Sequence, residues 1–153
     1  MNRLLKQLQV NLLAIIGLVV AVSALNVSTM RADVSERQRN VRDASFLILE
    51  QLSYLQLLVD NSHYGLSVDG DQGATLRVNP IEGWARVNYV RDLAVVVPEP
   101  APHSLELLHR VWSEEINRLA GGDRDLSLKA NQHISAQIEH ARNQVKSVLV
   151  SLK

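Results

Sequence analysis

Residues 10–27 read VNLLAIIGLVVAVSALNV. The stretch is apolar apart from Asn11, Ser23 and Asn26, and at helical rise it spans roughly 27 Å, close to the hydrocarbon thickness of a bilayer. It lies within the first 64 residues, which contain no proline and a single glycine. The sequence therefore predicts one long helix whose first part is a transmembrane anchor over residues 10–27.

Two interpretations of this apolar stretch are open. A short basic tail over residues 1–9, with Arg3 and Lys6, precedes it, and Val22-Ser23-Ala24 has the small side chains of a signal-peptidase site. A cleavable signal peptide would share these features. The helical pattern continues past Ala24 without a break, which favours an anchor that is kept.

The charges around the anchor give conflicting signals about its orientation. Arg3 and Lys6 favour a cytoplasmic N-terminus, whereas four arginines follow the apolar segment and favour the reverse. A short tail without a folded domain usually stays behind as part of a signal anchor. We therefore expect a single-pass protein of the inner (plasma) membrane, with the bulk of the chain periplasmic or extracellular.

Small residues recur along one side of the predicted anchor at intervals of three and four. Such a row lets another helix backbone come close, which is how helices associate in lipid. Small residues are also common in membrane helices without any such role. The candidate membrane-helix packing residues are Ala14, Gly17, Ala21, Ala24 and Ser28.

Residues 28–45 form a polar continuation of the same helix. Apolar residues recur every seven positions through it, a spacing that can face a partner helix in a coiled coil. The stripe crosses a charged stretch, so a solvated helical stalk is favoured over a self-sufficient coiled coil. Its members are Val27, Val34, Val41, Ile48 and Leu55.

The segment from Phe46 to Val59 is apolar over most of the helix circumference, which predicts burial by several neighbours. The helical domain is therefore expected over residues 46–153. The long helix should end near Asn61 to Gly65, where residues that favour helix ends cluster. Residues 66–79 alternate apolar and polar positions about a DGDQG turn, so a small hairpin or a loop is expected there.

Two further helices are predicted from their caps and their periodicity. Asn79 and Pro80 begin one, and Pro98 ends it ahead of an extended, proline-rich connector. Ser104 is expected to cap the next. The predicted apolar faces are Trp84, Val87, Val90, Ala94 and Val97 in the first helix, and Leu105, Leu108, Trp112, Ile116 and Leu119 in the second.

The last helix, which starts at Asp123 or Asp125, has the clearest heptad repeat of the chain. Its helix–helix seam can pack inside its own bundle or between subunits. The opposite side carries a polar stripe of His133, Gln137, His140 and Gln144, which solvent explains. The seam residues are Ile134, Ile138, Ala141, Val145, Val148 and Leu152.

Composition and motifs exclude several classes of function. The absence of cysteine removes disulfides and thiolate chemistry, and the part beyond Lys6 is slightly acidic, which disfavours nucleic acid as a partner. No nucleophile elbow, phosphate loop, zinc motif or dinucleotide fingerprint occurs. The Asp69-x-Asp71 spacing lacks the glycine and glutamate of a calcium loop. We expect no enzyme activity, no cofactor and no metal.

The predicted fold is all-α: a single N-terminal transmembrane helix continues into a long helix, which joins an antiparallel bundle of about four helices. The leading hypothesis is a structural or accessory subunit of a membrane complex, with lipid, a second copy of the chain or another membrane protein as partners. One alternative is an extracytoplasmic small-molecule sensor using Arg86, Arg91, Trp84 or His109. Another is a regulator that acts through its membrane segment, as lysis inhibitors do.

Overall fold

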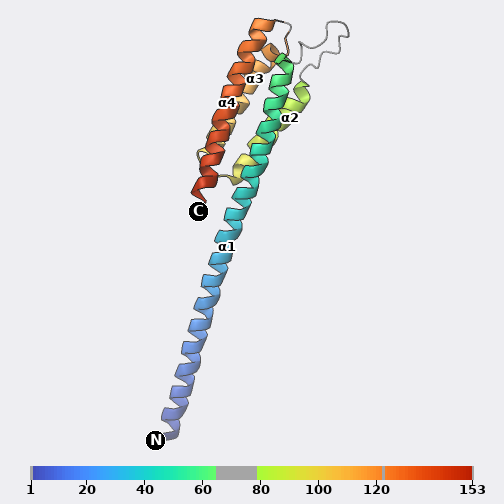
Figure 1. The fold of residues 1–153 in the computed structure, drawn as a ribbon. Coiled ribbons are helices and arrows are strands. Elements are labelled where there is room, and N and C mark those ends of the chain that lie inside the picture. Colours follow the sequence, from blue (N-terminus) through green and yellow to red (C-terminus); the bar gives the residue numbers. More distant parts are fainter. Residues whose placement is uncertain (1, 65–78, 122, 153) are drawn as a thin grey trace. The chain divides into compact units, whose positions relative to one another are not determined.

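The computed structural model describes the backbone of residues 2–64, 79–121 and 123–152. Side chains are described from Leu12 on, without residues 13, 15, 63 and 64. Within these ranges the chain forms four α-helices and one short 3-10 helix (Figure 1), which confirms the prediction of an all-α fold. The hairpin or loop expected over 66–79, and the Asp69-x-Asp71 spacing within it, lie outside the described residues apart from Asn79.

The chain divides into two compact units, Met1–Arg39 and Asn40–Lys153. Helix α1 (Asn2–Tyr64) begins in the first unit and ends in the second. The second unit starts before residue 46 because Val41, Ala44 and Ser45 are already buried in the bundle. The bundle therefore takes in the last part of the segment expected to be stalk.

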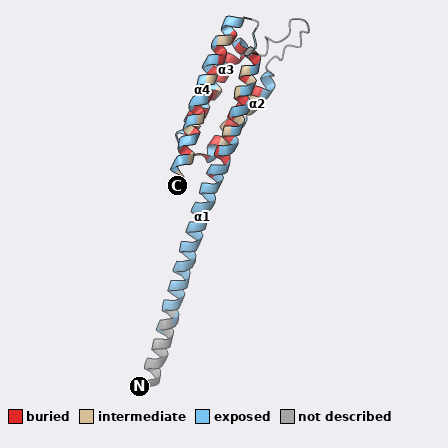
Figure 2. Cartoon of the chain, in the orientation of Figure 1, coloured by how far each residue is buried: buried red, intermediate tan, exposed pale blue. Residues whose placement is uncertain are grey.

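In the first unit, every α1 side chain described is exposed (Figure 2). One helix of the described chain is long and apolar enough to cross a membrane, and none of its 18-residue apolar window is buried. The core helix of a soluble protein can match this length and composition, but it would be covered by its neighbours. The predicted long apolar helix at the N-terminus is confirmed.

Helix α2 (Pro80–Leu93) begins as predicted. The Asn79 side-chain oxygen accepts hydrogen bonds from the backbone N–H groups of Ile81 and Glu82, at 3.1 and 3.4 Å. Pro80 occupies the first turn, where its missing N–H would have no helical partner anyway. The helix tightens into the 3-10 turn η2 (Ala94–Val96) before Pro98.

Helix α3 (Ala101–Leu119) starts earlier than predicted. Ser104 is not its cap: the Ser104 hydroxyl donates to the Ala101 carbonyl at 2.7 Å from within the first turn. Pro102 is tolerated there because a first-turn residue needs no N–H partner. The proline-rich connector is therefore shorter than expected.

Helix α4 (Arg124–Ser151) uses the first of the two predicted starts. The Asp123 carboxylate accepts from the backbone N–H groups of Asp125 and Leu126, at 2.9 and 3.0 Å. A carboxylate at this position also interacts favourably with the positive end of the helix.

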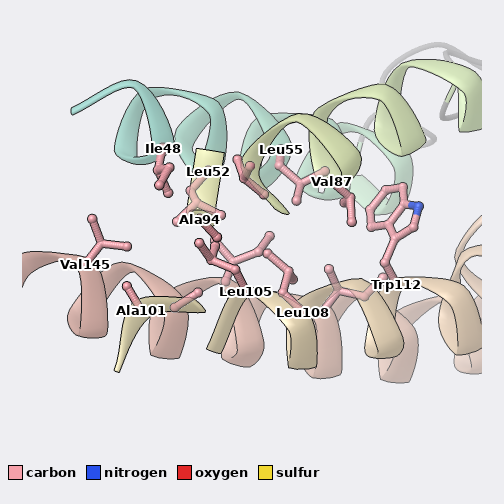
Figure 3. Packing of buried hydrophobic residues seen from close by; sticks show 14 of the residues in the cluster. Ile48, Leu52, Leu55, Val87, Ala94, Ala101, Leu105, Leu108, Trp112 and Val145 are labelled. Carbon is pink, nitrogen blue, oxygen red and sulfur yellow. The ribbon is translucent and has the colours of Figure 1, made fainter. Parts of the chain in front are cut away.

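The four helical segments of the second unit alternate in direction along the chain (Figure 1), so the bundle is antiparallel as predicted. Their inward faces form one core (Figure 3), in which each helix supplies large buried side chains. The largest fully buried side chains include Ile48, Leu52 and Leu55 of α1, Val87 and Val90 of α2, Leu105, Leu108 and Trp112 of α3, and Ile134 and Ile138 of α4.

The expectation that α1 is covered on all sides after residue 46 is wrong. Ile48, Leu52 and Leu55 are fully buried, but Phe46 and Leu57, on the opposite side of the helix, are 57% and 56% exposed. In a bundle, α1 has neighbours on one face only. Its outward face, which also carries Glu50 and Ser53, has no partner in the described chain.

Candidate functional site

The predicted α4 seam lies inside the chain's own bundle. Ile134, Ile138, Ala141, Val145 and Val148 are buried, and Leu152 is partly buried and packs against the same core. Of the two partners left open by the heptad pattern, this structure has the intramolecular one. Because this apolar face is already covered, the seam offers no free surface to another subunit.

The predicted small-residue row of α1 is exposed along its whole length. Ala14, Gly17, Ala21, Ala24 and Ser28 all lie in the first unit and have no helix packed on them in the described chain. A Cβ added at Gly17 would meet no atom within 4 Å. A second helix backbone therefore has room to approach this face.

The residues considered for small-molecule contacts fall into two separate groups. Trp84 of α2 meets His109 of α3 edge to face, with ring centroids 5.5 Å apart. The Arg91 guanidinium of α2 lies 3.0 Å from Nε2 of the same His109 ring. Because Arg91 always carries protons, its guanidinium donates and the imidazole accepts. This group links α2 to α3.

Arg86 belongs to the other group, between α2 and α1. Its guanidinium donates to the Glu82 carboxylate at 2.6 Å and to the Gln51 side-chain oxygen at 2.9 Å, and it lies over the Tyr54 ring, 4.8 Å from the centroid. Gln51, Glu82, Ala85, Arg86 and Tyr89 line a shallow surface pocket here. Arg86 is already paired with a carboxylate and stacked on a ring, so an anion would have to compete with Glu82 for it.

A buried carboxylate joins α3 to α4. Glu115 is buried, and its side chain accepts hydrogen bonds from Arg118, at 3.0 and 3.1 Å, and from His133 Nδ1, at 3.1 Å. Burial alone raises the pKa of the Glu115 carboxyl, but the bonds from His133 and Arg118 outweigh it, so this pKa lies below its ordinary value. The sequence pattern placed His133 on the solvated stripe of α4, so its contact with Glu115 was not predicted.

Polar side chains also fix the pairing of α4 with α1. The buried Asn131 donates from its side-chain nitrogen to the Val59 carbonyl at 3.1 Å, and Gln56 donates to the Ser135 hydroxyl at 2.8 Å. A buried amide among apolar residues favours the one register in which it finds its partner. Asn131 continues the spacing of the seam by one position toward the start of α4, but the sequence could not supply its partner.

The packing of α2 on α3 depends on Gly83, a glycine within α2. A Cβ at Gly83 would lie 2.1 Å from Cζ2 of Trp112, so the indole occupies the space that a side chain would need. Glycine inside a helix is unfavourable, and this cost was the available signal of a close contact. Trp112 Nε1 is buried, with no hydrogen-bond partner in the described part of the chain.

Among the described residues, no group of three or more histidine or acidic side chains could hold a metal ion. The polar clusters found there are explained by contacts between helices. No family model matches the chain, no curated protein matches it in sequence, and no solved structure matches it. The candidate functional features are therefore the exposed faces of α1.

Proposed function

We propose that this chain is a single-pass membrane protein that acts as a structural or accessory subunit of a membrane protein complex. The observation that carries the proposal is the exposed apolar surface of α1 in the first unit, of which the membrane-length window is wholly uncovered. Large exposed apolar surfaces mark contact with lipid or with another protein. A helix suits lipid because it satisfies its own backbone hydrogen bonds.

The anchor in this proposal covers residues 10–27, and the helical bundle stands outside the membrane. With a cytoplasmic N-terminus, the bundle is periplasmic or extracellular. The bundle closes its own core from four helical segments of the chain. The anchor and the bundle therefore have separate tasks: one holds the protein in the membrane and the other is presented beside it.

Contacts with other subunits fall to the faces of α1 in this proposal. The α4 seam is already used within the bundle. The row that contains Gly17 and Ala21 supplies a close-packing face within lipid. The exposed side chains of Phe46 and Leu57, on the outward side of α1, supply a second, partly apolar surface beyond it.

Purification in a mild detergent tests this function. The proposal predicts that the full chain elutes as an oligomer or together with another membrane protein, and that Gly17→Leu weakens this association. Val19→Leu is the matched control, because it adds bulk to the same segment on another side of the helix. A monodisperse monomer without a partner would contradict the proposal.

A further inference from the structure

An apolar stripe on α1 continues beyond the bundle with the spacing it has inside it. Within the bundle, Val41 and Ile48 of this stripe are 7% and 0% exposed. In the first unit, Val27, Met30 and Val34 follow the same spacing but are 49%, 69% and 58% exposed. The stripe that faces partner helices in the bundle thus has no partner over residues 27–34.

The surface around this exposed stripe is slightly hollowed. A shallow groove runs along this side of α1 and is lined by both apolar and polar side chains. Its lining residues are Val27, Met30, Arg31, Val34, Ser35 and Gln38.

We propose that residues 27–34 of α1 pack against the same residues of a second copy of the chain, as a short parallel two-helix contact. The inference rests on the proposed membrane anchor, since two copies inserted in the same direction hold this stripe at the same height. Val27 and Val34 occupy the first core position of the heptad, a, and Met30 occupies the second, d. Val or Ile at the first position with Leu at the second favours two parallel helices, and Met30 takes the place of that Leu here.

The polar residues beside the stripe fit a parallel arrangement. In parallel helices, Asn26 of one copy faces Arg31 of the second copy, and Asp33 faces Gln38 of the second copy. Each pair joins a hydrogen-bond acceptor to a donor. In an antiparallel arrangement centred on Met30, Arg31 would approach Arg31 of the second copy, and the like charges would repel.

The contact is short because Arg37 takes the next position of the stripe. Residues 27–34 cover little more than one heptad, which is too short for a stable coiled coil between free chains in water. Two anchored copies share a membrane surface, so their effective concentration is high and a weak contact suffices. The contact therefore depends on membrane insertion.

The small-residue row is not part of this contact. At about 100° per residue, Ala21, Ala24 and Ser28 lie roughly a third of a turn around the helix from Val27, Met30 and Val34. The stalks can therefore pair through one face while the anchors keep the other face for a different helix.

Disulfide cross-linking in native membranes tests the pairing, because the chain has no cysteine of its own. The proposal predicts that Val27→Cys and Val34→Cys each give a covalent dimer when the membranes are oxidised. Ala32→Cys, at nearly the same height on the opposite side of α1, is the matched control and is expected to give at least several-fold less dimer. Membrane sedimentation of each variant is measured in parallel.

The outcomes of the cross-linking experiment distinguish the helix pairing from the proposed subunit function. Equal cross-linking at residues 32 and 34, or no dimer in a chain that sediments with membranes, overturns the pairing and leaves the proposed subunit function standing. Cross-linking only when the residue 27 and residue 34 variants are mixed shows antiparallel helices and also overturns it. A cross-link from residue 34 to a different protein also overturns the pairing, because that protein then occupies the place assigned to the second copy. Loss of the chain from the membranes removes the proposed function as well.

Discussion

The two units of the molecule place the same heptad stripe in opposite environments. Val27 and Val34 of α1 are exposed, whereas Val41, Ile48 and Leu55 are buried by other helices of the chain. The spacing is the same throughout, so periodicity predicts that a face will be covered but not what covers it. In the second unit the partner is encoded in the same chain, whereas in the first unit no described residue covers the stripe.

Truncating one stripe residue in each unit gives the largest contrast. Ile48→Ala should lower the free energy of unfolding of the bundle by about 2–5 kcal/mol, because it leaves a cavity in a closed core. Val34→Ala should change it by less than about 0.5 kcal/mol. Denaturant unfolding of the full chain in detergent measures both, since Trp84 and Trp112 report only on the second unit. Equal effects would show that the stripe packs alike in both units.

Two glycines of the helices allow the next comparison. Gly83→Ala should destabilise the bundle by about 1–3 kcal/mol, because its Cβ would collide with the Trp112 ring. Gly17→Ala meets no atom within 4 Å and should leave bundle unfolding unchanged. The same tryptophan signal serves for both variants. Because alanine is the better helix former, a stabilised Gly83→Ala protein would show that the indole does not fill this space.

The buried carboxylate of α3 predicts the response of the bundle to acid. The pKa of Glu115 is lowered on folding, so its contribution is complete above the unfolded-state pKa and is lost as the pH falls through the folded-state pKa. Glu115→Gln should cost about 1–3 kcal/mol at neutral pH and flatten the loss of stability in acid. Melting temperatures from neutral pH down to pH 3 measure this. The exposed neighbour Glu114→Gln is the control, and an identical slope in both variants would refute the assignment.

The smallest effect is expected at the exposed ion pair of α2. Glu82→Gln removes the charge that Arg86 contacts, but both side chains are partly solvated. Such pairs contribute about 0.2–1 kcal/mol, and salt screens them. Unfolding in low and high salt should therefore differ little between the variant and the parent chain. A loss of stability as large as that of Glu115→Gln would mean that the contacts of Arg86 with Glu82, Gln51 and Tyr54 hold α2 to α1.

Local signals predicted most of the fold. Asn79 with Pro80, and Asp123, mark helix starts through contacts within a few residues, and the heptads of α4 mark its buried face before any partner is known. The start of α3 was placed too late because Ser104 resembles a cap, whereas a proline in the first turn permits an earlier beginning.

Contacts between helices could not be predicted in this way. The pairing of Glu115 with His133, the fit of Trp112 against Gly83 and the exposure of Phe46 all depend on which helix lies beside which. For a helix apolar on nearly every side, the sequence holds no signal that singles out the face without a neighbour. No described residue of the chain covers the exposed stripe, and neither periodicity nor composition names a partner for it.

The fate of α1 in cells tests the account most directly. Membranes from cells that express the full chain are washed with alkaline carbonate, and the N-terminus of the retained protein is sequenced. The account predicts that the chain stays in the membrane pellet with residues 10–27 still attached to the bundle. Release of the chain into the supernatant, or a mature N-terminus near Leu25, would contradict it.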